Sequence, residues 1–327
     1  MTLHAPFPYF GGKRKVVDEV WKRFGEPKQY IEPFCGSAAI LLGAPKAASL
    51  EVICDASGFI ANFWRAVKHQ PEEVARAADY PVSHIDLGAR HAWLMQQRER
   101  LSAELHDPDW PGDAKVAGWW LWGQCCWIGA GWCDWDKAMG KIPHVSDPGR
   151  GVQAVGGIPH VSDAGRGVQG ISRVVSSDDE PPAELLTSSG RVAWQWLRRL
   201  SDRLERVRVV HGDWHRCLNH HYGKRDTAVF LDPPYDGFES LYGKTAPTAA
   251  TVSEWAREHE DMRVAICGHL GDYDLPGWEV FGWSRGKLTY GSSKTTEQEA
   301  IWFSPGCLSP RSEARECEGA AQIGVLL

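Results

Sequence analysis

The chain has 327 residues, of which 43% are hydrophobic and 24% are charged, and its formal net charge is −6. These values are ordinary for a folded protein, and the negative charge argues against a chain that coats nucleic acid indiscriminately, although it permits a local basic cleft. The sequence shows no apolar run of membrane-spanning length, no signal-peptide pattern and no paired framework among its nine cysteines. We therefore expect free thiols and a cytoplasmic location.

The first part of the chain, residues 1–82, alternates between strand and helix patterns. Residues 29–34 predict a strand, and the turn Cys35-Gly36-Ser37 leads from it into a predicted helix. Glycine in such a turn lets the backbone approach a ligand, and the helix N–H groups face it. Because the turn lacks both the P-loop sequence and the three-glycine dinucleotide fingerprint, it favours a nucleoside ligand without phosphates.

A second predicted strand, residues 50–54, ends at Asp55. In doubly wound nucleotide sites, an acid about 20 residues after the glycine turn accepts hydrogen bonds from ribose hydroxyls. The alternative role for Asp55 is that of a helix N-cap, which is equally common.

Residues 83–190 differ from both flanks, because they hold a tryptophan cluster followed by a glycine-rich stretch. We interpret most of the tryptophans as the core of an inserted region, with stacking of one or two on DNA bases as the alternative: Trp119, Trp120, Trp122, Trp127, Trp132 and Trp135. Residues 142–153 recur almost unchanged as residues 158–169, which indicates a duplicated surface insertion. The alternative for this repeat is a DNA-contacting loop that uses Arg150 and Arg166.

Strand and helix patterns return in residues 191–304. Residues 207–210, 228–231 and 263–267 predict strands, and residues 278–283 and 300–303 predict a closing antiparallel pair. Residues 305–327 have the pattern of a flexible tail. Arginines on or beside the predicted helix form either a solvated face that offsets nearby acids or a phosphate-contacting edge: Arg191, Arg198, Arg199, Arg203, Arg206 and Arg208.

The segment Asp232-Pro233-Pro234-Tyr235 directly follows the apolar run at residues 228–231. Two prolines cannot continue a strand, because neither has an N–H group to donate to the neighbouring strand. The segment therefore lies at the carboxyl edge, where open α/β sheets bind their ligands. An acid, two stiff prolines and an aromatic ring at that edge form a rigid bracket for a flat, amine-bearing group such as a nucleobase.

Four blocks of the chain, in this order, resemble those of the Dam-like adenine-specific DNA methyltransferases, in the version carried by phages and prophages. The blocks are residues 6–13, residues 32–37, Asp55 with Asn62, and residues 232–235. Gly212-Asp213 resembles a further segment near the adenine of the cofactor. The resemblance covers residues 6–82 and 191–303 and leaves out the Trp-rich and repeated stretch.

This resemblance implies an α/β fold: a mixed, Rossmann-like methyltransferase sheet with a closing antiparallel pair and an inserted target-recognition region. It implies S-adenosylmethionine as the methyl donor, no metal, and transfer to the 6-amino group of an adenine flipped out of double-stranded DNA. The implied cofactor-binding residues are Tyr9, Phe10, Gly11, Gly12, Lys13, Phe34, Gly36, Ser37, Asp55, Asp213 and Asp232. In this role, Phe10 is the alternative to Tyr9.

The implied catalytic residues are Asp232, Pro233, Pro234 and Tyr235. The Asp232 carboxylate and the Pro233 carbonyl accept hydrogen bonds from the target amine, Pro234 directs the turn, and Tyr235 stacks on the base. His269 stands near a position where relatives often carry a Ser-Asn pair, and we expect it to line the pocket as a neutral histidine.

Two other functions stay open at this point: transfer to the 4-amino group of cytosine, and DNA binding without catalysis. The cytosine enzymes usually replace the leading Asp with Ser, and the intact Asp232 and Lys13 disfavour a non-catalytic role. No nuclease motif and no obligate protein partner are evident. We expect a stand-alone enzyme of a bacterial cell or a phage-infected host.

Overall fold

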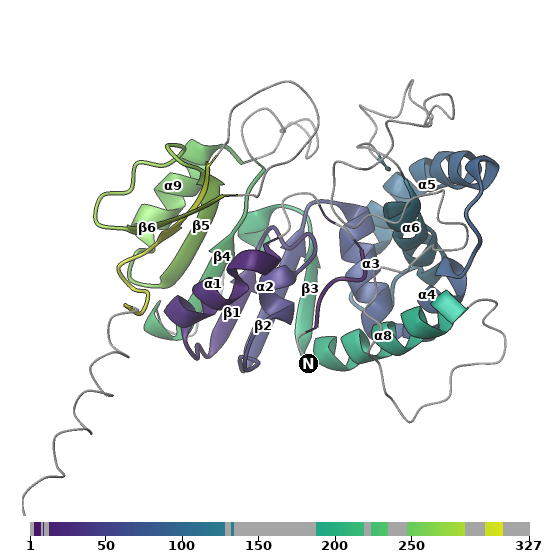
Figure 1. The fold of residues 1–327 in the computed structure, drawn as a ribbon, viewed down its shortest axis with the longest axis horizontal. Helices are drawn as coiled ribbons and strands as arrows, with labels where there is room; N and C mark the ends of the chain where they lie inside the picture. Colours follow the sequence, from purple (N-terminus) through teal and green to yellow (C-terminus); the bar gives the residue numbers. More distant parts are fainter. Residues whose placement is uncertain are drawn as a thin grey trace, which may run out of the picture.

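A computed structural model of the protein describes residues 3–7, 9, 13–127, 132–133, 188–218, 224–234, 247–284 and 298–309. In this part of the chain, helices flank a seven-stranded mixed sheet of order β3-β2-β1-β4-β5-β7-β6 (Figure 1). Strands β1 to β5 pair in parallel, whereas β7 is antiparallel to β5 and β6. The strands are β1 (Gln29–Glu32), β2 (Leu50–Asp55), β3 (Val207–His211), β4 (Thr227–Leu231), β5 (Arg263–His269), β6 (Glu279–Ser284) and β7 (Gln298–Phe303).

The central strands are short apolar runs that the fold buries on both faces. All four residues of β1 and all five of β4 are buried. Such continuous burial is typical of parallel strands, whose crossover connections place helices over both faces of a sheet. The predicted parallel strands and the predicted closing antiparallel pair, β6 with β7, are confirmed.

The strand order reverses at β1. Strands β2 and β3 lie on one side of β1, and β4 and β5 lie on the other. At such a switch point the loops after the two neighbouring strands diverge, and open α/β sheets bind their ligands in the crevice between them. The loop after β1 therefore lies at this carboxyl edge of the sheet. Asp232 directly follows β4 and lies at the same edge.

Side chains alternate between the two faces of the sheet, so each strand contributes to two layers of core. Tyr30 of β1 faces α1 (Val17–Phe24), where Trp21 and Phe24 lie against its ring. Ile31 faces the opposite layer, which includes α9 (Ala249–Glu258) and the 3-10 helix η2 (Trp214–Cys217). The remaining short elements are η1 (Arg14–Val16), α2 (Ala39–Leu42) and η3 (Lys224–Asp226).

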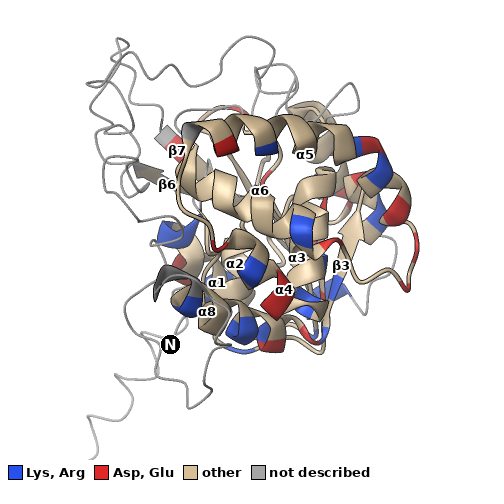
Figure 2. Ribbon diagram, turned by 90° about the vertical axis from the view of Figure 1, so that its right-hand side faces the viewer, with Lys and Arg blue, Asp and Glu red and all other residues tan. Residues whose placement is uncertain are grey.

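A group of helices packs together near the β3 end of the sheet, as Figure 1 and Figure 2 show. Within the group, α4 contacts α6 and α8, and α3 contacts α5, α6 and α8. The group consists of α3 (Gly58–His69), α4 (Pro71–Ala78), α5 (His84–Glu104), α6 (Ala114–Cys126) and α8 (Ser188–Leu204).

The described tryptophans of the predicted insertion lie in a core that is shared with residues 1–82. The ring centroid of Trp120 lies 5.0 Å from that of Phe7 and 5.5 Å from that of Phe63 on α3. Trp132 donates its Nε1–H to the backbone oxygen of Trp120. Trp122 and Trp127 are also buried, Trp119 is half-buried, and Trp135 lies outside the described residues. The described part of the predicted insertion is therefore continuous with the rest of the core.

Two of the arginines on α8 bind acids of the protein itself. Arg203 contacts both carboxylate oxygens of Glu51 on β2, at 2.5 and 2.7 Å. Arg198 lies 2.8 Å from Glu72 of α4. These contacts attach α8 to β2 and α4, in agreement with a helix face that offsets nearby acids.

The chain stays packed beyond residue 305, where the sequence predicts the start of a tail. The backbone N–H of Gly306 donates a hydrogen bond to the backbone carbonyl of Glu260, and the backbone N–H of Leu308 donates one to the backbone carbonyl of Arg23. Residues 142–169, with Arg150 and Arg166, and residues 310–327 lie outside the described residues. None of the described helices combines the length and apolar character that a membrane span needs.

Candidate active site

The loop after β1 is tied to the end of β2 through Asp55. The backbone N–H of Gly36 donates to Oδ2 of Asp55 at 3.0 Å, and that of Ser57 donates to Oδ1 at 2.8 Å. Asp55 is only 3% exposed, and burial raises its pKa to about 6 although both hydrogen bonds act to lower it. Ser57, not Asp55, is the N-cap of α3, so the N-cap alternative for Asp55 is wrong.

Tyr9 packs directly against the glycine of this loop. Gly36 has a φ of +43°, and a Cβ atom there would lie 2.4 Å from Cε1 of Tyr9. Only glycine fits both the left-handed backbone and the close approach of the ring. The structure therefore brings together Tyr9, Gly36 and Asp55, three of the predicted cofactor-binding residues. Ser37 is half-buried in the same loop, and the predicted helix that follows is the single turn α2.

Phe34 lies next to an aromatic residue that the sequence patterns did not single out. Its ring stacks on that of Trp214 with centroids 5.6 Å apart and an interplanar angle of 29°. Trp214 follows Asp213, whose carboxylate caps η2 by accepting the backbone N–H of His215 at 2.9 Å. Asp213 is thus at the expected edge, but its exposed carboxylate is engaged with His215. Its neighbour Trp214 is 4% exposed and supports the ring of Phe34 from within the core.

Lys13 and Asp232 form an ion pair across the switch point. The Nζ atom of Lys13 lies 2.8 Å from Oδ1 of Asp232, and the two side chains are 5% and 22% exposed. Burial alone would lower the pKa of Lys13, but the negative charge of Asp232 and smaller contributions from Cys267 and Glu299 raise it. The lysine is therefore held as an ammonium group against the predicted catalytic carboxylate.

The rest of the predicted catalytic segment is described only in part. Pro233 is buried and Pro234 is half-buried. Tyr235, Phe10, Gly11 and Gly12 lie outside the described residues. His269 lies on the next strand, where its backbone N–H donates to Asp272 at 2.6 Å.

Two buried acids near Asp232, Glu32 and Glu299, were not among the predicted site residues, although Glu32 begins the block of residues 32–37. Glu32 accepts hydrogen bonds from the Tyr30 hydroxyl at 2.9 Å and from the backbone N–H of Leu41 at 3.1 Å. Burial raises the pKa of Glu32 to about 8, and the charge of Asp232 adds to this effect. Glu299 of β7 is 4% exposed and lies opposite His269. A charged residue at an inward position of an apolar strand was the signal available for both.

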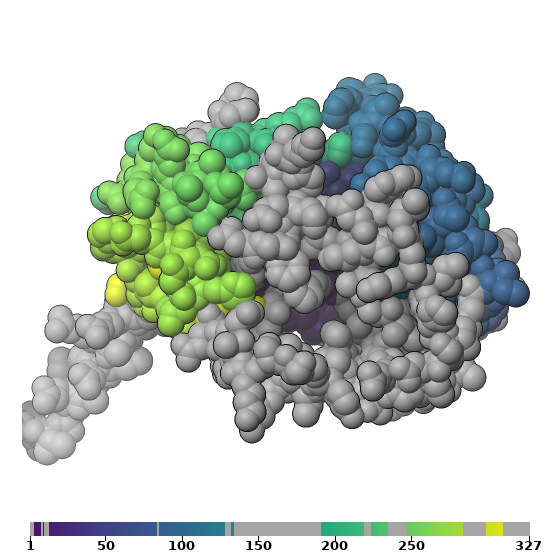
Figure 3. Space-filling view, turned by 90° about the horizontal axis from the view of Figure 1, so that it is seen from above, coloured from purple at the N-terminus to yellow at the C-terminus, as the bar shows by residue number. Residues whose placement is uncertain are grey.

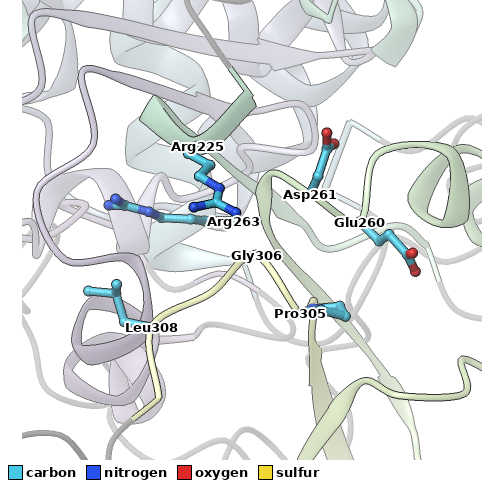
Figure 4. Close-up of a pocket in the computed structure, with 7 residues that line it drawn as sticks. All are labelled: Arg225, Glu260, Asp261, Arg263, Pro305, Gly306 and Leu308. Carbon is cyan, nitrogen blue, oxygen red and sulfur yellow. The ribbon is translucent and has the colours of Figure 1, made fainter.

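The described residues also line a cavity of about 590 Å³ at the opposite, amino edge of the sheet (Figure 4). Arg225, Asp261 and Arg263, which immediately precede or begin β4 and β5, are among its lining residues. None of the predicted site residues lines it. At the carboxyl edge, Figure 3 shows α4–α6 in blue and α9 in green on opposite sides of the molecule.

Among the described residues, no cluster of three or more His, Cys, Asp or Glu side chains could hold a metal ion. Cys125, Cys126 and Cys133 are buried as free thiols, and burial raises the pKa of all three.

The protein has an α/β fold of the Rossmann-like methyltransferase type. This class is defined by the mixed sheet with its switch point at β1 and by the Gly36 loop that binds Asp55 at the carboxyl edge. Residues 9–87 match the family model of the D12 class N6 adenine-specific DNA methyltransferases. This match covers less than half of the chain: residues 9–87 carry a Dam-like methyltransferase domain, and this domain supports the methylation of adenine in DNA. Methyltransferases of this kind generally use S-adenosylmethionine. No curated protein matches the chain.

The family match decides between the two target amines that the sequence patterns left open, in favour of adenine. The matched segment contains Tyr9, Lys13, Gly36 and Asp55, which the structure gathers at the carboxyl edge of the sheet.

Proposed function

We propose that the protein moves a methyl group from S-adenosylmethionine to the 6-amino group of an adenine that is flipped out of double-stranded DNA. The observation that carries this proposal is the ion pair between Lys13 and Asp232 beside the Gly36–Asp55 loop. It places a fixed carboxylate next to a loop that suits a nucleoside, at the edge where open α/β sheets bind ligands.

The residues at this edge fit S-adenosylmethionine. Asp55 is a buried carboxylate whose oxygens can each accept a further hydrogen bond, as a ribose diol requires. The half-buried ring of Phe34, which stacks on the buried ring of Trp214, offers apolar surface for an adenine. When bound, the cofactor supplies a methyl group activated by its sulfonium centre. The proposed binding residues are Tyr9, Phe10, Gly11, Gly12, Lys13, Phe34, Gly36, Ser37, Asp55, Asp213 and Asp232.

The chemical difficulty lies in the target amine, whose lone pair is conjugated with the adenine ring and is a poor nucleophile. The Asp232 carboxylate and the Pro233 carbonyl accept hydrogen bonds from the two amine N–H groups, which favours a tetrahedral nitrogen. Lys13 orients the carboxylate for this task. Pro234 fixes the direction of the turn. Transfer would form a bond between the amine nitrogen and the methyl carbon, break the bond from that carbon to sulfur so that S-adenosylhomocysteine leaves, and release one amine proton to solvent. Most of the rate arises from alignment of the amine with the methyl group.

Flipping the adenine out of the duplex costs a few kcal/mol. Stacking of the base on Tyr235 recovers about 1–3 kcal/mol of this cost. We place sequence recognition in residues 83–190, between the cofactor-binding part at residues 1–82 and the catalytic part at residues 191–304. The enzyme acts alone and without a metal, in the cytoplasm of a bacterial cell or a phage-infected host.

The test is nucleoside mass spectrometry of DNA that lacks adenine methylation, after incubation with the purified protein and S-adenosylmethionine. We expect N6-methyladenine with the wild type and none with Asp232→Ala. The matched control is Asp226→Ala, which removes a half-exposed aspartate, paired with Lys28, at the other end of β4 and should leave activity intact. Methylated cytosine, no product, or full activity of Asp232→Ala would each contradict the proposal.

A further inference from the structure

We propose that Glu299 is a positioning residue for methyl transfer: from β7, its carboxylate holds the ammonium group of Lys13 in place against Asp232. This inference rests on the proposed function. It concerns a residue outside the segment that matches the family and outside every motif in the sequence.

Glu299 lies on the same sheet face as the catalytic carboxylate. In the register between β5 and β7 it lies opposite His269, and Ile301 lies opposite Cys267, so Glu299 shares the inward face with Cys267. Asp232 follows Phe230, another residue of that face, by two positions. Because neighbouring strands lie about 4.8 Å apart, β4 and β7 flank β5 at a separation of about 10 Å. The small side chain of Cys267 leaves room between the two acids for an ammonium group.

Lys13 is the cation that occupies this position. It is only 5% exposed, and a buried ammonium group needs compensating charge. Asp232 supplies one partner at 2.8 Å. Burial lowers the pKa of Lys13, but the negative charge of Asp232 and, to a smaller extent, that of Glu299 raise it. Glu299 is therefore close enough to act on the same ammonium group from the other side of β5.

The expected effect of Glu299 on the reaction follows from the solvent exposure of the two carboxylates, Asp232 and Glu299. Asp232 is 22% exposed and can meet a substrate amine, whereas Glu299 is 4% exposed and cannot. A lysine that loses the second carboxylate no longer holds Asp232 in one orientation, and transfer depends on that orientation. Glu299 should therefore affect the rate of transfer more than the affinity for S-adenosylmethionine.

The test compares Glu299→Gln, Glu299→Asp and the control Glu51→Gln. Glu51 is another buried glutamate of the same sheet, paired with Arg203 and remote from the carboxyl edge. We expect Glu299→Gln to lower the single-turnover rate about 10- to 100-fold, the size of a small misplacement at a reacting centre. The dissociation constant of S-adenosylmethionine, measured by titration calorimetry, should stay nearly unchanged, and Glu299→Asp should recover part of the rate. Glu51→Gln should keep the full rate per folded molecule.

The pH dependence of the single-turnover rate distinguishes a positioning role of Glu299 from a purely structural one, because a structural role would leave it unchanged. The groups that face Lys13 or its partner are Asp232 from β4, Cys267 from β5, Glu299 from β7 and Glu32 from β1. Without the charge of Glu299, the pKa of Lys13 falls, so activity should be lost at a lower alkaline pH in Glu299→Gln than in Glu51→Gln.

The outcomes separate the two proposals. An active wild type with an unchanged rate and pH profile in Glu299→Gln overturns the role of Glu299 alone. A wild type that methylates no adenine contradicts the proposed function and this inference with it. If Glu299→Gln does not fold, Glu299→Asp decides, because it keeps the charge and shortens the side chain: we expect a single-turnover rate below that of the wild type, and a rate equal to that of the wild type would overturn the inference.

Discussion

The backbone N–H of Gly36 donates a hydrogen bond of 3.0 Å to the carboxylate of Asp55, which joins the loop after β1 to the end of β2. The same carboxylate accepts the N–H of Ser57 through its other oxygen. One buried acid thus fixes two loops at the edge that we assign to the cofactor.

Replacing Asp55 with Asn should therefore weaken cofactor binding and the loop together. The amide group of Asn cannot accept both backbone hydrogen bonds, because one of its two ends is a donor. We expect the dissociation constant of S-adenosylmethionine to rise about 10- to 100-fold, the equivalent of one charged hydrogen bond. Titration calorimetry measures it. Asp113→Asn, at the N-cap of α6, is the control and should leave cofactor affinity unchanged.

Gly36→Ala should destabilise the protein because the left-handed backbone and the Tyr9 ring both oppose a Cβ atom. The expected loss is about 1–3 kcal/mol of unfolding free energy, measured by urea denaturation. Gly271→Ala separates the two causes, since Gly271 also has a positive φ, of +107°, but no atom near its Cβ position. If the two variants lose equal stability, crowding by Tyr9 contributes nothing.

The free energy of unfolding should depend on pH because folding raises the pKa of Glu32. Its pKa is raised from 4.5 to about 8 in the folded protein, so between these values the folded state binds more protons than the unfolded state. The contribution of Glu32 to stability is therefore most favourable below pH 4.5 and decreases as the pH rises to about 8.

Glu32→Gln should flatten this decrease, as measured by urea denaturation at pH 5, 6, 7 and 8. The control is Glu254→Gln, at an exposed position on α9, which should keep the wild-type slope. A Glu32→Gln slope equal to that of the wild type would contradict the assignment.

Arg203→Ala should cost about 3–5 kcal/mol of unfolding free energy, because it leaves Glu51 buried without its partner. Changing both residues to leucine should recover part of this loss, since a buried ion pair can be replaced by apolar packing. Denaturation curves of the single and double variants test this. A single variant that loses less than the double one would show that the pair is not what stabilises the contact between α8 and β2.

The sequence was informative where the signal is local. The apolar runs at β1, β2, β4 and β5 predicted the parallel strands, and the two prolines after Leu231 marked the edge of the sheet. The spacing of Gly36 and Asp55 indicated that both residues lie at one edge of the sheet, and the structure brings them together.

The rest depends on contacts between distant parts of the chain. Glu299 is one glutamate in a strand pattern, and only the register of β7 against β5 brings it to the edge that holds Lys13. Trp214 stacks on Phe34 because the fold brings the loop after β1 close to the loop after β3, and the sequence alone does not show this. Trp120 and Trp122 of α6 were correctly expected to be buried, but the partners of Trp120, Phe7 and Phe63, belong to residues 1–82 and not to the predicted insertion.

The contact of Trp120 with Phe7 and Phe63 has a practical meaning for engineering. A hybrid enzyme made by exchanging the chain at residue 83 would join helices α5 and α6 of one protein to α3 and α4 of another, and each tryptophan would meet foreign neighbours. Junctions placed after Cys133 and before α8 leave this packing intact. A graft between those two points therefore alters the stretch in between while the hydrophobic contacts of Trp120 with Phe7 and Phe63 keep their native partners.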